Sequence, residues 1–144
     1  MTWIFDTPPS YSFFLLRLGL AVTFFFHSTQ QIFGWFGGRG VQAHLANWRD
    51  KHRIPVPVGA LGLFIEFFGS FALLIGCLTR PFALGLAVFI AIAMIKSHWG
   101  HGFFLARRPG EASGIEYTLA LFLIAVALVI DGAGAFSVDR LLSR

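Results

Sequence analysis

The chain has 144 residues, of which 56 % are hydrophobic and only 12 % are charged. Because ordinary globular domains carry about 25 % charged residues, this composition argues against a soluble domain. The formal net charge of +4 does not indicate a nucleic-acid partner, since the basic residues stand between apolar runs, where membrane topology accounts for them. The single cysteine, Cys77, excludes an intrachain disulfide and a Cys-x-x-Cys redox relay.

Four long apolar runs predict an all-α fold, an integral membrane four-helix bundle forming a single domain over residues 1–144. A helix that crosses a membrane needs about 20 mainly apolar residues. The runs cover residues 12–33, 58–78, 82–97 and 115–130. The tight link Thr79-Arg80-Pro81 makes the second and third runs antiparallel neighbours, with Thr79 as the expected N-cap.

The first run carries three polar side chains at a depth where such groups need a partner, a wet cavity or a function. His27 and Gln31 are four residues apart and share a helix face. Arg17 lies within an arc of about 80° of both, at about 100° per residue. This pattern indicates either a polar seam that hydrogen-bonds neighbouring helices or a ligand pocket near the end of the run, and both interpretations stay open.

The segment from residue 34 to residue 57 is the longest and most polar connection. It predicts an interfacial helix around residues 41–52. Basic residues are concentrated in this segment and in the loop after the third run. By the positive-inside rule, we expect these two loops in the cytoplasm and both termini on the other side.

The second run contains a stripe of small residues with one carboxylate among them. The stripe consists of Gly59, Gly62, Glu66, Gly69 and Gly76. Their spacing places them on one helix face, where small residues let another helix approach closely. Glu66 therefore faces protein rather than lipid. It is interpreted either as a structural partner of a basic residue or as a neutral acid, or else as a group that handles protons or substrate.

The ends of the third and fourth runs add further polar groups. His98 and His101 have a spacing that can ligate metal, but a lone instance is a weak signal, and no metal site is predicted. Ser113 and Glu116 have the spacing of a capping box before the fourth run. Glu116 and Tyr117 can still face a site, because a cap and a site wall are compatible.

The topology brings these groups to one membrane side, because runs one and three end there and runs two and four begin there. We therefore expect a polar cavity that opens at the first and third loops. The residues predicted as catalytic are Glu66 and His27. Those predicted as ligand-binding are Arg17, Gln31, Lys96, His98, Glu116 and Tyr117.

Several short motifs resemble those of the DoxX family and follow the family's order over almost the whole chain. They are Arg17-Leu18-Gly19, His27-x-x-Gln30-Gln31, Ile65-Glu66-Phe67-Phe68-Gly69, Leu74-Ile75-Gly76-Cys77, Gly114-Ile115-Glu116-Tyr117 and Asp131-Gly132-Ala133-Gly134. The chain departs from the family pattern at Ser28 and Ala133. The resemblance implies a four-helix membrane protein and quinone-linked redox chemistry, since the family takes its name from a subunit of thiosulfate:quinone oxidoreductase. It also implies a multi-pass protein of a bacterial or archaeal inner membrane.

Three functions remain open from the sequence. The first is quinone-linked redox chemistry in the polar cavity, with quinone as the candidate ligand and with either a redox partner or a bound cofactor transferring the electrons. The second is a non-catalytic membrane subunit that anchors or assembles a redox enzyme. The third is a small-solute permease. Whether the chain is itself an enzyme is not fixed, and an oligomer with itself or with other subunits is expected.

Overall fold

A computed structural model describes residues 2–143, which are helical without any strand in that range. The elements are η1 (Thr2–Ile4), α1 (Tyr11–Phe33), η2 (Trp35–Gly37), α2 (Val41–His52), α3 (Val56–Ile75), α4 (Thr79–Ala93), the π turn η3 (Met94–His98), η4 (Trp99–His101), α5 (Glu116–Asp131) and α6 (Val138–Leu142). The all-helical class is therefore confirmed, and helices occupy each of the four predicted runs.

Three segments are long and apolar enough to cross a membrane. They are α1, α3 and the continuous helical segment Thr79–His101. The fourth, α5, has 16 residues. At about 1.5 Å per residue it is about 24 Å long, shorter than a hydrocarbon core of about 30 Å. Length and composition thus support three candidate spans, and α5 is too short to count as a fourth by the same criterion.

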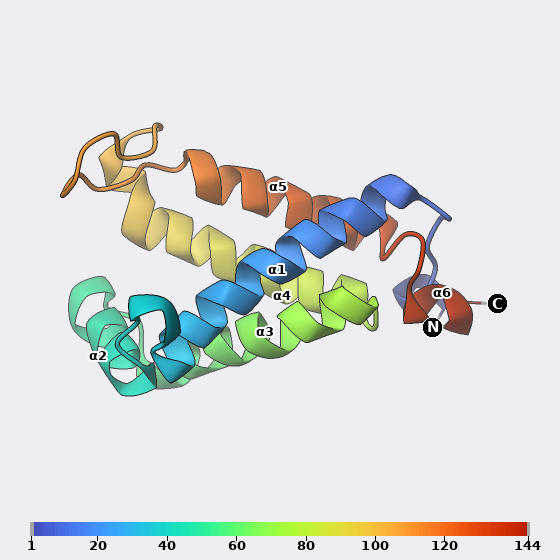
Figure 1. The fold of residues 1–144 in the computed structure, drawn as a ribbon, viewed down its shortest axis with the longest axis horizontal. Helices are drawn as coiled ribbons and strands as arrows, with labels where there is room; N and C mark the ends of the chain where they lie inside the picture. The colour runs from blue at the N-terminus through green and yellow to red at the C-terminus, as the bar shows by residue number, and fades with distance from the viewer. Residues whose placement is uncertain (1, 144) are drawn as a thin grey trace.

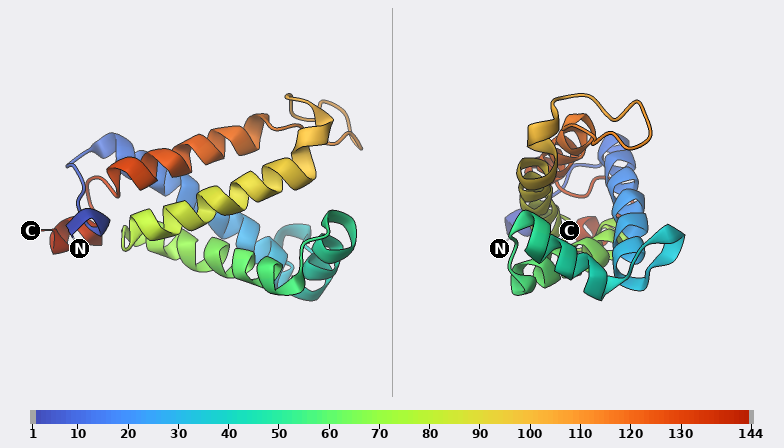
Figure 2. Two further views of the ribbon diagram at one scale, coloured as in Figure 1. Left: turned by 180° about the vertical axis from the view of Figure 1, so that it is seen from behind. Right: turned by 90° about the vertical axis from the view of Figure 1, so that its left-hand side faces the viewer.

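The long helices lie lengthwise in two packed pairs, α1 with α3 and α4 with α5. Helices α3 and α4 are antiparallel neighbours, as the short link between them predicts (Figure 1). The predicted helix at residues 41–52 is confirmed as α2. It lies crosswise at one end of the molecule, as the end-on view in Figure 2 shows. The loop after η4 lies at that same end, and both termini lie at the other.

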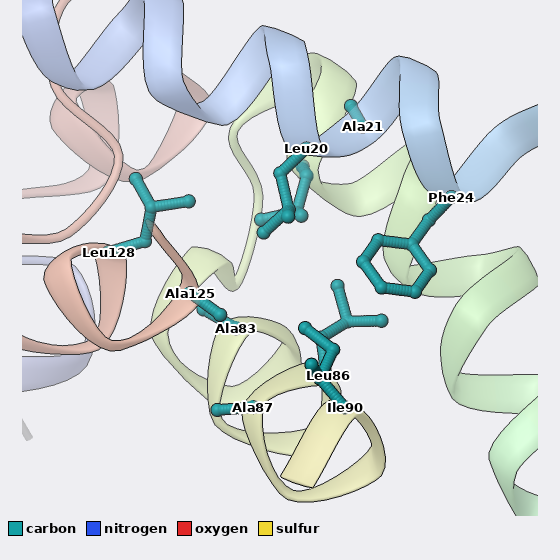
Figure 3. Close-up of a cluster of buried hydrophobic side chains, with 10 residues drawn as sticks. Leu20, Ala21, Phe24, Ala83, Leu86, Ala87, Ile90, Ala125 and Leu128 are labelled. Atoms are coloured by element: carbon teal, nitrogen blue, oxygen red, sulfur yellow. The ribbon is translucent and has the colours of Figure 1, made fainter. Parts of the chain in front are cut away.

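The core forms where α1, α4 and α5 converge on α3. Its larger members are Leu20, Phe24, Leu73, Leu86, Ile90 and Leu128, all buried. Figure 3 shows the side chains of α1, α4 and α5 pointing toward a common centre. The small-residue face of α3 is confirmed, because Gly59, Gly62, Glu66 and Gly69 are all buried. A Cβ atom on Gly69 would already touch Leu86 of α4, so α3 and α4 approach closely there.

Both predicted helix caps are wrong, because neither Thr79 nor Ser113 forms a capping hydrogen bond. Helix α4 begins at Thr79, and the carboxylate of Asp139 accepts hydrogen bonds from the N–H groups of Leu78 (2.7 Å) and Thr79 (2.9 Å). At α5, Ser113 accepts from the N–H of Ala106 and Glu116 from the N–H of Leu105. These two side chains fix the preceding loop instead of capping the helix.

Arg17 lies at the end of the bundle that holds the termini, away from His27 and Gln31 of the same helix. Its guanidinium is buried and donates hydrogen bonds of 2.6–3.3 Å to backbone carbonyl oxygens. The acceptors are Leu73, Leu74, Ala133, Ala135 and Phe136. The absence of a side chain at Gly76 makes space for this guanidinium, since a Cβ atom there would stand 2.6 Å from Nη1 of Arg17. Arg17 therefore ties the end of α3 to the segment after α5.

Candidate functional site

A cavity of about 250 Å³ lies at the opposite end of the bundle, next to α2. Helices α1, α2, α3, α4 and α5 and the π turn η3 all contribute to its wall. Its polar lining residues are His27, Gln31, His44, Glu66, Ser97, His98, Tyr117 and Thr118. Its apolar lining residues are Phe24, Trp48, Phe89, Ile90, Ala93 and Leu121. The wall therefore combines several converging polar groups with an aromatic and aliphatic surround, as ligand sites do.

Glu66 is the most deeply buried ionisable group of this wall, with only 2 % of its surface exposed. It stands on the face of α3 that also carries Gly62 and Gly69, so its carboxyl group points into the bundle. Its Oε2 atom has no hydrogen-bond partner among residues 2–143. The only ion pair in that part of the chain is the exposed one between Arg49 and Asp50. The interpretation of Glu66 as the partner of a basic residue is therefore wrong.

Two more buried polar atoms of the same wall lack partners within the described residues. They are Oε1 of Gln31 on α1 and Nε2 of His44 on α2. Buried polar atoms are almost always hydrogen-bonded, because leaving one unpaired costs about 1–3 kcal/mol. Three unpaired atoms from three helices around one cavity are the arrangement expected of a site that hydrogen-bonds a polar ligand.

The π turn η3 supplies the side of the wall opposite α1. A π turn widens a helix locally and is frequent at functional sites. Here it carries Ser97 and His98, which both line the cavity. Nδ1 of His98 lies 2.9 Å from the carbonyl oxygen of Ser113, which fixes the ring against the loop before α5. The Ser97 hydroxyl lies 3.4 Å from Nδ1 of His52, which connects the cavity wall to the end of α2.

His44 belongs to α2 and lines the cavity. Its ring lies 4.5 Å from the ring of Trp48, one helical turn away. Burial lowers the pKa of His44 from its ordinary value, and the nearby His52 lowers it further. The neutral imidazole is therefore favoured, and a neutral ring presents one nitrogen that donates and one that accepts.

A family model described as DoxX matches residues 12–99, more than half of the chain. The chain belongs to the DoxX family. No curated protein and no solved structure matches it. The matched region runs from α1 to η4 and includes His27, Gln31, Glu66 and His98. In this DoxX protein, only the α5 part of the cavity wall lies outside the match.

The DoxX cavity brings together five of the eight predicted site residues, namely His27, Gln31, Glu66, His98 and Tyr117. His27 is exposed at the cavity's edge, and its ring lies 6.5 Å from the ring of Phe24. The other three lie elsewhere. Arg17 is at the opposite end of the bundle, because backbone carbonyls there satisfy its guanidinium. Lys96 and Glu116 are exposed and do not line the cavity.

Nine residues of the wall were not predicted as site residues, and those of them whose side chains can form hydrogen bonds are His44, Trp48, Ser97 and Thr118. A signal existed for the first two, since His44 and Trp48 are four residues apart and share one face of α2. Ser97 and Thr118 stand beside His98 and Tyr117 but carry no charge or motif that marks them. Within residues 2–143, no group of three His, Cys, Asp or Glu side chains is placed to hold a metal ion.

Proposed function

We propose that this DoxX protein binds the head group of a lipid-soluble quinone in the cavity beside α2 and exchanges protons with it through Glu66. The observation that carries the proposal is the convergence of three unpaired buried atoms, from Gln31, His44 and Glu66, on one cavity of a membrane protein. A quinone is soluble in the bilayer and presents two polar oxygens to such a wall.

The side chains suit both redox forms of the head group. Quinone oxygens accept hydrogen bonds, and quinol hydroxyls also donate them. The amide of Gln31 and the imidazoles of His27 and His44 each offer donor and acceptor atoms. In this proposal His27 and Gln31 orient the head group, while Glu66 transfers a proton to or from one of its oxygens. An unpartnered carboxylate charge is costly to bury, which favours a group that exchanges a proton over one that keeps its charge.

The size of the cavity favours a head group of one ring. Pockets for drug-sized ligands measure about 300–1,000 Å³. The cavity here, at about 250 Å³, is smaller. It suits a benzoquinone ring better than an extended solute, and the ring can lie against Phe24 or Trp48 of the wall.

Reduction of a quinone to a quinol takes up two electrons and two protons. The cavity wall supplies groups for protons, but none of its side chains is a reversible two-electron donor. The electrons therefore come from a separate redox protein, which makes this chain the quinone-binding subunit of an oxidoreductase rather than a complete enzyme.

The proposed site also implies a placement in the membrane. We infer that α5 is a fourth span of a multi-pass protein in a bacterial or archaeal inner membrane. It packs along α4, it buries Ala125 and Leu128, and it exposes the apolar Leu123 and Ile130. Its short length is accommodated by local thinning of the bilayer. The cavity end, with the basic residues of α2 and of the loop after η4, faces the cytoplasm.

The proposal predicts that Glu66→Gln weakens quinone binding. The amide keeps the shape of the side chain but cannot exchange a proton. Because hydrogen bonds to ionisable groups contribute about 1.5–3 kcal/mol, the affinity for a decyl-substituted benzoquinone should fall about tenfold or more. The measurement is a fluorescence titration of the purified protein in lipid nanodiscs. Glu111→Gln, in the exposed loop, is the matched control. Equal affinities for the two variants and the wild type would contradict the proposal.

A further inference from the structure

A second hollow, of about 100 Å³, lies on the outer side of α3 and α4. Its wall is apolar and includes Val58, Leu61, Val88 and Ile92. Leu61 and Val88 are 58 % and 53 % exposed, so this groove opens outward rather than into the bundle core. On a membrane protein, that side of α3 and α4 faces lipid.

The groove adjoins the polar cavity. Trp48, Phe89, Ala93 and Ser97 line both hollows. The rings of Trp48 and Phe89 lie 5.4 Å apart with an angle of 33° between their planes. This aromatic pair stands between the polar cavity inside the bundle and the apolar groove outside it.

Two glycines line the groove, one on each of its helices. Gly62 of α3 and Gly85 of α4 both line it. A Cβ atom on Gly62 would stand 2.8 Å from the Phe89 ring and 3.5 Å from the Trp48 ring. A Cβ atom on Gly85 would stand 3.0 Å from Ile65. The missing side chains therefore let the aromatic pair lie against the backbone of α3 and let Ile65 lie against the backbone of α4.

We propose that the groove holds the first part of the apolar tail of the ligand whose head group occupies the cavity. The tail leaves the cavity beside Trp48 and Phe89 and enters the bilayer between α3 and α4. This assignment rests on the proposed function, because it takes a quinone head group as given. It adds the position of the ligand's isoprenoid or alkyl tail and the route by which that ligand enters.

A second apolar hollow on the bundle surface serves as a comparison. It lies between α1 and α3 and is lined by residues such as Val22, Phe25 and Phe71. Its volume is about 190 Å³, but it shares no lining residue with the polar cavity. The lining residues shared with the cavity therefore favour the α3–α4 groove.

The test compares two probes, a benzoquinone without a tail and its decyl-substituted counterpart, titrated against protein in lipid nanodiscs. Val88→Trp fills the groove from its lipid side. It should lower the affinity for the decyl compound about tenfold, because the tail no longer fits, and leave the affinity for the tail-less compound unchanged. The matched control is Val22→Trp, at a position of similar exposure in the other hollow, and should change neither affinity. Gly85→Leu, which adds a side chain at a glycine that lines the groove, is the second variant if Val88→Trp does not accumulate.

The outcomes separate this inference from the proposed function. If the wild type binds neither probe, the proposed function fails, and this inference fails with it. If the wild type binds both probes but Val88→Trp changes neither affinity, or lowers both equally, the groove does not hold the tail while the cavity site stands. An effect of Val22→Trp equal to that of Val88→Trp would also overturn the assignment.

Discussion

At the scale of single residues, Arg17 shows how a buried charge can serve the fold alone. Its guanidinium donates to five backbone carbonyl oxygens, and a lysine has only three donors. Arg17→Lys should therefore leave buried carbonyls unpaired and lower the free energy of unfolding by about 2–4 kcal/mol. Thermal unfolding in detergent, followed by circular dichroism, measures this. Arg108→Lys is the control, because Arg108 is exposed in a loop. A melting temperature equal to that of the control would contradict the structural role.

His44 predicts a specific dependence of stability on pH. Burial, and secondly His52, lowers its pKa in the folded protein from the ordinary value of 6.5. The unfolded chain therefore takes up a proton first as the pH falls, so this contribution to stability is complete above pH 6.5 and is lost below it. Between about pH 7.5 and about pH 5.5, the melting temperature of His44→Gln should therefore fall by less than that of the wild type. His101→Gln, at an exposed histidine, should behave as the wild type. The account of His44 fails if both variants keep the full pH dependence.

At the scale of secondary structure elements, α4 depends on a group 60 residues away. The carboxylate of Asp139 accepts from the first backbone N–H groups of the helix, next to Leu78 in the left-handed region (φ 52°). Asp139→Ala should cost about 1–2 kcal/mol, the usual loss for a cap, and should speed hydrogen exchange in the first turn of α4. Asp6→Ala, at an exposed carboxylate of the same end, provides the control. Unchanged exchange at residues 78–82 would show that the cap is not needed.

The helices could be predicted from the sequence, whereas most of their end contacts could not. Apolar runs fix the helices because burial or lipid contact requires them, and the observed ends lie within a few residues of those runs. The cap of α4 and the partners of Arg17 depend on where the segment after α5 folds back. That position is a tertiary property with no local sequence signal. Glu66 could be predicted as a site residue because it is a carboxylate on a glycine face that is recognisable in the sequence. Ser97 could not, because its place in the wall depends on the π turn η3.

At the scale of the whole molecule, the unpaired buried polar atoms at the α2 end of the bundle differ from those at the other end because they surround the cavity. At the end with the termini, Arg17 donates to backbone carbonyl oxygens, while Thr7 and Asp139 accept from backbone N–H groups. The unpaired atoms at that end belong to Thr79 and Arg80, which do not line the cavity. At the α2 end, Gln31, His44 and Glu66 keep unpaired buried atoms around a cavity, and an apolar groove adjoins it. The convergence of polar residues at one end was predictable from topology. The part that α2 plays in the wall was not, because it depends on how that helix docks.

The most direct test of the central claim is mass spectrometry of small molecules that remain bound to the protein after purification from membranes that contain quinones. The account predicts that a quinone is retained by the wild type and by Glu111→Gln and is lost from a folded Glu66→Gln protein. Absence of any quinone from all three proteins, with their helical content intact, would contradict the account. That result would point to a membrane subunit that anchors a redox enzyme.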